Sequence, residues 1–280
     1  MKYSFRLLNV FALESDRFSG NPLCVFEDAR GLMDEQMQAL ALQFNLSETT
    51  FVLPSDTATA HVRIFTPAFE MPFAGHPTLG TAHAVRELRD AGDEITLQMQ
   101  AGIIPVLAHG DTWTLRANAP KARPPEASRE QLASMLGLKT EDIGAQPLWV
   151  NTGAEQLIIP LTSVAAVART KPDVRLLARY GSTSDERCLA YVWADCGEGV
   201  LARFFFGRGT AIAEDPATGS AAANLGGWYL ATGCSTSLER VIWQGEYINR
   251  PSQLHLRVDA GRNIFVAGRV LEVGRGAVEI

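Results

Sequence analysis

The alternation of apolar and polar positions predicts many short strands and only a few helices. Residues 34–44 place apolar side chains on one face at helical spacing, whereas 3–13, 22–27 and 49–53 have the β-branched and aromatic side chains of strands. The second half repeats this order of predicted elements, with strand 156–161, helix 172–180, strands 188–193 and 200–206, and helix 220–230. The order indicates an α+β chain with an internal repeat.

Three residues of one loop in the first half recur in the second half at a constant spacing. They are Glu70, Pro72 and Gly75, which return 144 positions later as Glu214, Pro216 and Gly219. In both halves an apolar strand precedes the loop and a run of small residues follows it. A constant spacing of about half the chain length predicts duplication of a whole domain.

Gly75 and Gly219 mark the point where each loop passes into a predicted helix. Glycine lets the backbone turn sharply and approach a ligand closely. Pro77 suits the first position of a helix, so we expect helices over 78–88 and 220–230. Both helices are apolar on nearly all sides, which is typical of buried helices. The N–H groups and partial positive charge at a buried helix start can bind a carboxylate or another oxyanion.

The length of 280 residues fits one large domain or two, at about 100–200 residues per domain, and the repeat favours two. Residues 117–125 contain Pro120, Pro124 and Pro125 and are the best candidate for a linker. We therefore predict a first domain over residues 1–118 and a second over 125–261. We also expect a strand within 262–280 to return to the first domain.

Composition excludes several classes of partner. A net charge of −6 argues against nucleic acid, which is bound by basic faces, and no apolar run approaches the ~18 residues of a membrane span. The first residues lack the apolar segment of a signal peptide. The four cysteines show no C-x-x-C pairing, so we predict a cytoplasmic protein with reduced, mostly buried thiols.

Four polar residues near the predicted helix and strand ends suggest proton chemistry. Partial burial of Glu48, just before strand 49–53, would raise its pKa toward the range useful for proton transfer, although a solvated loop glutamate is the alternative. His76 could donate to a substrate oxygen, and Asp215 at a helix start would orient a substrate group. With Ser220 and the two helix starts, they predict a cofactor-free isomerase, epimerase or tautomerase. We expect the site in a cleft between the domains.

Other chemistries lack their sequence patterns. A hydrolase built on Ser220, His76 and Asp215 would need a G-x-S-x-G motif, which is missing. His76 and His83 have no third ligand at a familiar spacing, so no metal is predicted. No phosphate-binding or dinucleotide-binding glycine motif occurs, and no lysine stands in a pyridoxal motif, so we predict no cofactor.

Four segments of the chain resemble signature segments of the PhzF-like phenazine biosynthesis family. These segments are Ser19-Gly20-Asn21-Pro22-Leu23, Asn45-Leu46-Ser47-Glu48-Thr49, Phe73-Ala74-Gly75-His76-Pro77-Thr78-Leu79-Gly80 and Glu214-Asp215-Pro216-Ala217-Thr218-Gly219-Ser220-Ala221. The resemblance spans nearly the whole chain. It implies a diaminopimelate epimerase-like fold of two pseudo-symmetric domains, each a curled, mainly antiparallel sheet or barrel around a central helix. It also implies a cofactor-independent isomerase that is typically a homodimer.

The resemblance further implies roles for individual residues. Glu48 would be the acid/base that moves the proton. The predicted set that binds a small carboxylate-bearing substrate is Asn21, Ser47, Gly75, His76, Asp215, Gly219 and Ser220, although Asn21 could equally be a turn former. His76 and Ser220 occupy the positions where diaminopimelate epimerases have a cysteine pair, so two-thiol racemisation is not expected. The alternatives are a catalytically silent metabolite-binding or interaction protein on the same fold, and an amino-acid racemase.

Overall fold

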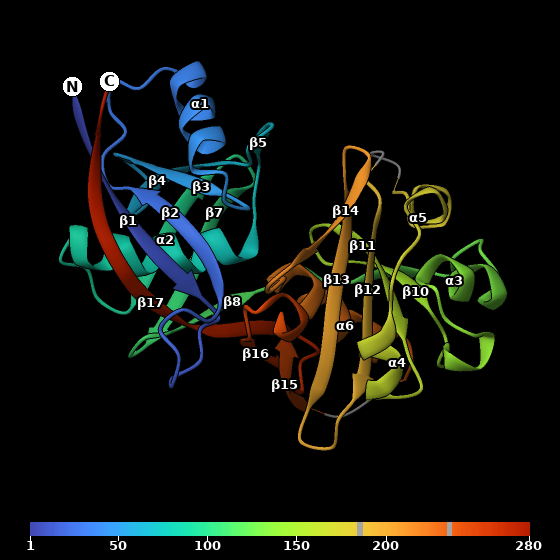
Figure 1. Ribbon diagram of the computed structural model, residues 1–280. Coiled ribbons are helices and arrows are strands. Elements are labelled where there is room, and N and C mark those ends of the chain that lie inside the picture. The colour runs from blue at the N-terminus through green and yellow to red at the C-terminus, as the bar shows by residue number, and fades with distance from the viewer. Residues whose placement is uncertain (184–186, 234–236) are drawn as a thin grey trace. The chain divides into compact units, whose positions relative to one another are not determined.

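Helix α2 (Gly75–Leu88) lies among the strands of the first half of the chain, as Figure 1 shows. It contacts β1, β2, β3, β4, β6, β7 and β8. The strands of the first half are β1 (Lys2–Val10), β2 (Asn21–Phe26), β3 (Thr49–Leu53), β4 (Ala60–Phe65), β5 (Glu70–Met71), β6 (Glu94–Met99), β7 (Gly102–His109) and β8 (Thr112–Arg116), and the C-terminal strand β17 (Ile264–Glu279) joins them. Helix α1 (Asp34–Phe44) has the bounds that the apolar spacing predicts.

The strands around α2 close into a barrel of eight. Strand β1 pairs with both β2 and β17, and β8 pairs with both β7 and β17, so no free edge remains in this ring. The neighbours β2 and β3 are parallel, as are β4 and β6, whereas the other paired neighbours for which the register is described are antiparallel.

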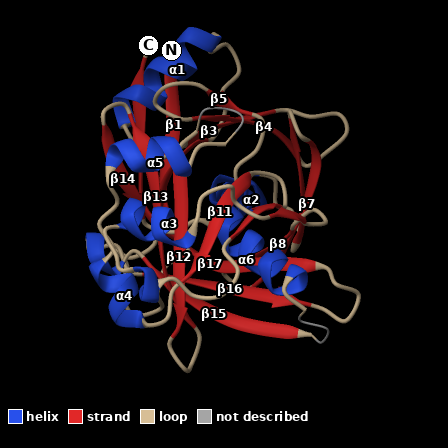
Figure 2. Ribbon diagram, turned by 90° about the vertical axis from the view of Figure 1, so that its right-hand side faces the viewer, coloured by secondary structure: helices blue, strands red, loops and turns tan. Residues whose placement is uncertain are grey.

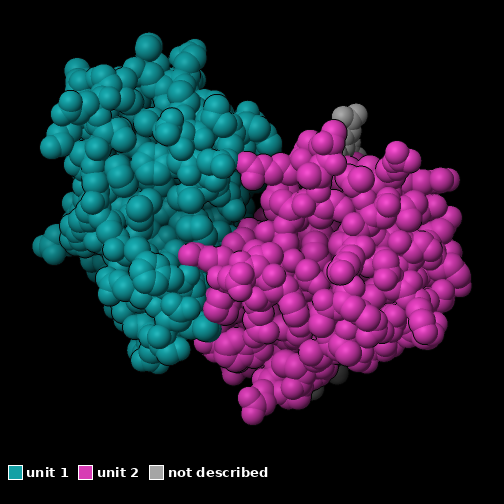
Figure 3. All heavy atoms as spheres, in the orientation of Figure 1, with its two compact units in different colours: residues 1–116, 267–280 teal, residues 117–266 magenta. Residues whose placement is uncertain are grey.

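The computed structural model describes residues 1–183, 187–233 and 237–280, and it divides into two compact units. Unit 1 is Met1–Arg116 with Ala267–Ile280, and unit 2 is Ala117–Val266 (Figure 3). The chain therefore leaves unit 1 directly after β8 and returns to it within β17. Residues 117–125, predicted as a linker, contain a strand of unit 2, β9 (Lys121–Arg123), which pairs with β10.

Unit 2 repeats the strand pairing of unit 1. Its elements are β9, α3 (Arg129–Leu136), η1 (Thr140–Asp142), β10 (Leu148–Asn151), β11 (Glu155–Pro160), α4 (Val164–Arg169), α5 (Val174–Tyr180), β12 (Leu189–Asp195), β13 (Val200–Arg208), β14 (Ala211–Asp215), α6 (Gly219–Ala231), β15 (Leu238–Gln244), η2 (Glu246–Ile248) and β16 (Ser252–Val258). The parallel pairs β11–β12 and β13–β15 correspond to β2–β3 and β4–β6. Figure 2 shows the predominance of strands over helices. The predicted α+β duplication is thus confirmed at the level of topology.

The two central helices begin earlier than the sequence predicts. Helix α2 starts at Gly75, so Pro77 is its third residue and not its first. A proline is tolerated there because the first four N–H groups of a helix have no partner within it. Most residues of both helices are buried. The packing around α2 is close, since a side-chain carbon at Gly80 would lie 2.5 Å from Cδ2 of Leu23.

The same ion pair braces the loop before the central helix in each unit. Arg63 of β4 makes two hydrogen bonds to Glu70 of β5, both of 2.7 Å. Arg203 of β13 makes the equivalent bonds to Glu214 of β14, at 3.0 and 2.7 Å. Each guanidinium also lies over a phenylalanine ring of its own strand. The loop that occurs twice in the sequence is therefore held in each unit by a buried or half-buried arginine.

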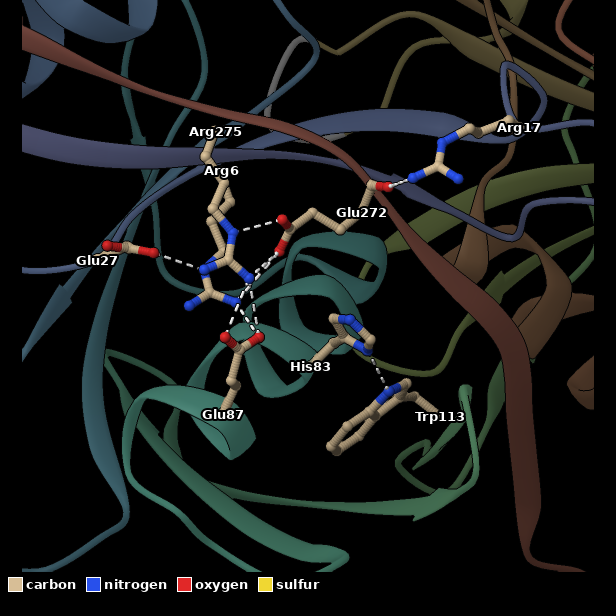
Figure 4. Close-up of polar contacts among 8 residues, drawn as sticks. All are labelled: Arg6, Arg17, Glu27, His83, Glu87, Trp113, Glu272 and Arg275. Atoms are coloured by element: carbon tan, nitrogen blue, oxygen red, sulfur yellow. Dashed lines mark hydrogen bonds and ion pairs between the residues drawn. The ribbon is translucent and has the colours of Figure 1, made fainter.

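A buried arginine ties the C-terminal strand into unit 1, as Figure 4 shows. Arg6 of β1 is 2% exposed and pairs with three carboxylates: Glu27 after β2, Glu87 of α2 and Glu272 of β17. The exposed Arg275 also contacts Glu87 and Glu272. Because a buried charge requires partners, this network joins three elements that are far apart in the sequence.

The predicted cysteine environment is only partly correct. Cys24 is buried, Cys188 is half-buried and Cys196 is exposed, and none of these three forms a disulfide bond within the described residues; Cys234 lies outside the described residues. Among the helices of the described part of the chain, none is long and apolar enough to cross a membrane.

Candidate active site

In unit 1 the predicted acid/base lies beside a buried imidazole. Glu48 directly precedes β3, and His76 is the second residue of α2. Oε2 of Glu48 is 3.5 Å from Nδ1 of His76, and the side chains are 16% and 7% exposed. Glu48 is therefore not a solvated loop residue. The start of α2 and the start of β3 bring the two groups together.

Burial keeps the imidazole of His76 neutral. Loss of solvent lowers its pKa to about 3, and the nearby Pro22 carbonyl opposes this shift only in part. Among the described residues Nε2 of His76 is buried without a hydrogen-bond partner. A neutral imidazole beside a carboxylate can donate from one ring nitrogen and accept at the other, so this pair can hold or pass a proton.

The start of α2 has the properties of an oxyanion site. Its N-cap residue, Ala74, has an extended backbone and no side-chain oxygen to cap the helix. His76, Pro77 and Thr78 are buried, so little water reaches the first turn. Backbone N–H groups and the positive end of the helix therefore favour a negative ligand here, such as a carboxylate.

Asn21 and Ser47 are two further predicted residues of unit 1. Asn21 is the first residue of β2 and is fully buried, so it is a strand residue and not an exposed turn former. Ser47 is half-buried beside Glu48. Thr49, which was not among the predicted site residues, is 1% exposed, and its Oγ1 has no hydrogen-bond partner among the described residues.

In unit 2 the predicted residues surround the start of α6. The Thr218 hydroxyl donates to Oδ2 of Asp215 at 2.6 Å, and the Gln244 amide donates to the Asp215 carbonyl at 2.9 Å. The contact with Thr218 fixes the Asp215 carboxylate against the loop. As in unit 1, the N-cap residue makes no side-chain cap to its helix, and Gly219 is buried.

Ser220 is held by buried amides that the sequence analysis did not consider. Nε2 of Gln156 donates to Oγ of Ser220 at 2.9 Å, and Asn224 of α6 donates to Oε1 of Gln156 at 2.8 Å. Gln156 and Asn224 are 4% and 0% exposed. The signal that could have found them is polar residues on an otherwise apolar strand and helix.

The described residues contain no group of three or more His, Cys, Asp or Glu side chains that could hold a metal ion. The polar groups at the two helix starts are a carboxyl–imidazole pair in unit 1, and a carboxylate and an oriented hydroxyl in unit 2. Such groups bind oxygen and nitrogen substituents and move protons.

Comparison with known proteins identifies the class. The sequence model of the family described as "Phenazine biosynthesis-like protein" matches residues 8–278. The chain therefore belongs to this family, and its relatives place it among the isomerases.

Three similar proteins show how closely the chain matches. An uncharacterized isomerase of Pasteurella multocida (strain Pm70) is 41% identical, covering 98% of this chain and 93% of that protein. The trans-2,3-dihydro-3-hydroxyanthranilate isomerase of Pseudomonas aeruginosa is 35% identical, covering 92% of each. The crystal structure of the Bacillus anthracis phenazine biosynthesis protein of the PhzF family superposes with a TM-score of 0.87 at 26% identity, covering 100% of both chains. The predicted family and fold are confirmed.

Proposed function

We propose that this isomerase moves a proton between two carbons of a small carboxylate-bearing substrate, with Glu48 as the acid/base and no cofactor. The observation that carries the proposal is the contact between Glu48 and neutral His76 at the uncapped start of buried α2. Membership of a family whose relatives are named isomerases supports the reaction class.

The proposed reaction has two proton steps. The Glu48 carboxylate takes a proton from a substrate carbon, and the electron pair of the broken C–H bond stays on the substrate. The new carboxyl O–H then gives its proton to a different carbon of the same molecule, which restores the carboxylate. A substrate carboxylate bound by the backbone N–H groups of a helix start would spread the developing negative charge.

Neutral His76 would act as a hydrogen-bonding partner in this reaction. Its Nδ1 faces Glu48, which leaves buried Nε2 for a polar substrate group. We further propose that Asn21 and Ser47 of unit 1 bind substrate with His76, and that Asp215, Gly219 and Ser220 of unit 2 bind polar groups of a substrate. The support is their position at element ends: Asn21 begins β2, Ser47 lies just before β3, Asp215 ends β14, and Gly219 and Ser220 begin α6.

The candidate substrate is trans-2,3-dihydro-3-hydroxyanthranilate, because a relative with 35% identity is named for it. In heavy water the wild-type protein should convert this compound and incorporate deuterium at carbon, as measured by NMR and mass spectrometry. Glu48→Gln should reduce incorporation by at least about 10³-fold while the affinity for a carboxylate ligand stays within about threefold, because a general base contributes typically 10²–10⁴-fold. The matched control is Glu35→Gln, which changes an exposed glutamate of α1.

The alternatives give different outcomes in the same experiment. A silent binding protein would take up the ligand without any deuterium exchange. A racemase would exchange deuterium at Cα of an amino acid such as proline and leave the dihydroanthranilate unchanged. Full exchange in the Glu48→Gln variant would exclude Glu48 as the proton carrier.

A further inference from the structure

Buried backbone groups fix the orientation of the Asn224 side-chain amide. The Thr152 N–H donates to Oδ1 of Asn224 at 2.9 Å, and Nδ2 of Asn224 donates to the Ala154 carbonyl at 2.8 Å. A backbone N–H can only donate and a backbone carbonyl can only accept. The oxygen and nitrogen of this amide therefore cannot exchange places without losing both bonds.

This orientation passes to the next amide in the network. Nδ2 of Asn224 also donates to Oε1 of Gln156 at 2.8 Å, so the NH₂ group of Gln156 must be on the other side. That group lies 2.9 Å from Oγ of Ser220. Since an amide nitrogen only donates, the Ser220 oxygen is the acceptor in this bond.

The direction of this bond decides what Ser220 offers to a ligand. A hydroxyl has one hydrogen to donate, and the bond from Gln156 does not use it. Within the described part of the chain, the Ser220 hydroxyl makes this one hydrogen bond, and the residue is partly exposed at the start of α6. Its hydrogen therefore stays available to a bound molecule.

We infer that Gln156 and Asn224 are positioning residues that present Ser220 as a hydrogen-bond donor, so that it binds an anionic oxygen of the substrate, such as a carboxylate. This inference rests on the proposed function for the identity of the bound molecule. The partial positive charge at the start of α6 favours the same kind of group.

Unit 1 shows that the fold does not need these amides. The residue 144 positions before Asn224 is Gly80, which packs against Leu23 and Val10, and Pro22 of β2 holds the place that Gln156 has in β11. In unit 1, apolar packing therefore occupies the place that the hydrogen-bonded amides occupy in unit 2. Buried amides in unit 2 must be fully hydrogen-bonded to be tolerated, and here they are bonded in one fixed direction.

The test is Gln156→Glu, which keeps the size of the side chain and replaces the donor by a second acceptor. Asn224 still donates to one oxygen of the new carboxylate, so Ser220 must turn its hydrogen toward the other. The probe is 3-hydroxyanthranilate, an aromatic compound with a carboxylate, an amine and a hydroxyl, and its Kd is measured by calorimetry from pH 6 to pH 9. We expect binding at pH 9 to weaken at least about tenfold, since the probe loses a hydrogen bond to its charged oxygen.

The loss should be smaller at pH 6 than at pH 9, because a protonated carboxyl can donate to Ser220 as the amide does. A packing defect would weaken binding equally at every pH. Gln253→Glu, a change of the same kind on β16 of unit 2, serves as the matched control and should leave the Kd unchanged at each pH.

A double-mutant cycle separates action through Ser220 from direct repulsion of the probe. In the Ser220→Ala background, Gln156→Glu should change the Kd by less than about threefold. Equal losses in both backgrounds would overturn the inference, as would wild-type affinity of Gln156→Glu across the whole pH range.

Neutron diffraction of the ligand-free protein tests the same point without any substrate. We expect the deuterium on Oγ of Ser220 to point away from Gln156. A deuterium directed at Gln156 would overturn the inference whatever reaction the enzyme performs. The expected orientation together with no binding of the probe would count against the proposed substrate class and not against the role of Gln156.

Discussion

Nδ1 of His76 lies 3.5 Å from Oε2 of Glu48, in surroundings where the imidazole is buried and the carboxyl is nearly so. Such a pair would be a salt bridge if both ring nitrogens of the imidazole were protonated, because the ring would then be positively charged. Burial acts against that charge more strongly than the Pro22 carbonyl favours it, so the pKa falls to about 3 and the imidazole stays neutral. The pair is thus a neutral imidazole beside the carboxyl group that we propose as the acid/base.

The first prediction concerns the pH dependence of stability. His76 has a pKa of about 6.5 in the unfolded chain and about 3 in the folded protein, so the unfolded state binds more protons between these values. The contribution of His76 to stability is therefore complete above pH 6.5 and is lost as the pH falls toward 3. By pH 5 the loss amounts to about 2 kcal/mol, since one pKa unit is worth about 1.36 kcal/mol.

Urea unfolding of the wild type and of His76→Gln at pH 7.5 and pH 5 measures this term. Burial also lowers the pKa of His83 and of His255, so only the difference between the two proteins isolates His76. The wild type should lose about 2 kcal/mol more than the variant between the two pH values. Equal losses would show that His76 titrates in the folded protein as it does in the unfolded chain and is charged at pH 5, which would contradict its lowered pKa.

The second prediction uses two adjacent threonines of β3 that differ in their partners. The Thr50 hydroxyl forms a buried 2.8 Å hydrogen bond with Thr81 of α2, whereas the Thr49 hydroxyl has no hydrogen bond within the described residues. Thr50→Val should reduce the free energy of unfolding by about 1–3 kcal/mol, because it leaves the Thr81 hydroxyl buried and unpaired. Thr49→Val should increase it by about 1 kcal/mol, because it removes a buried hydroxyl that gains nothing from the protein.

Thermal and urea unfolding of the two variants supply the comparison, and each variant controls for the loss of a hydroxyl from the same strand. We expect Thr49→Val also to slow deuterium exchange into the substrate, because a polar group kept at a cost beside Glu48 suits a ligand. Destabilisation by Thr49→Val would mean that its hydroxyl already has a partner in the folded protein.

The sequence predicted what depends on repetition and periodicity. The constant spacing of 144 positions, as between Glu70 and Glu214, predicted the duplication, and the strand pairing confirms it. Apolar spacing gave α1 its bounds, because helix α1 buries one face only. The starts of α2 and α6 were placed too late, since a proline and small residues carry no periodic signal at a helix start.

The candidate site was predictable only where residues stand in a motif. Glu48 and His76 could be named from the sequence, but their contact depends on where β3 and α2 meet, which no spacing along the chain encodes. Gln156 and Asn224 are 68 residues apart and look like exceptions in apolar segments until the fold joins them. The direction of a hydrogen bond depends on all members of its network, so the role of Ser220 could not be inferred from its neighbours in sequence.

The third prediction compares the duplicated ion pairs. Arg203 and Glu214 have side chains that are 11% and 7% exposed, and those of Arg63 and Glu70 are 19% and 20% exposed. Arg63 also pairs with Asp34, whereas Arg203 donates its other hydrogen bonds to the backbone carbonyls of Val167, Ala168 and Thr170. Removing the carboxylate from unit 2 should therefore cost more, because it leaves a buried guanidinium without a counter-charge.

We expect Glu214→Gln to reduce the free energy of unfolding by about 2–4 kcal/mol and Glu70→Gln by about 1 kcal/mol. The urea midpoints of the two variants show which of them loses more free energy of unfolding. Raising the salt concentration should reduce the loss caused by Glu70→Gln more than that caused by Glu214→Gln, since the Arg63–Glu70 pair is more exposed. Glu214 directly precedes Asp215, so Glu214→Gln should also weaken substrate binding. Arg203→Lys, with Glu214 retained, should keep the pair of opposite charges but lose the two parallel hydrogen bonds of the guanidinium to the carboxylate. Equal losses in the free energy of unfolding for the two glutamate variants would show that the deeper burial of the Arg203–Glu214 pair does not make its carboxylate more important.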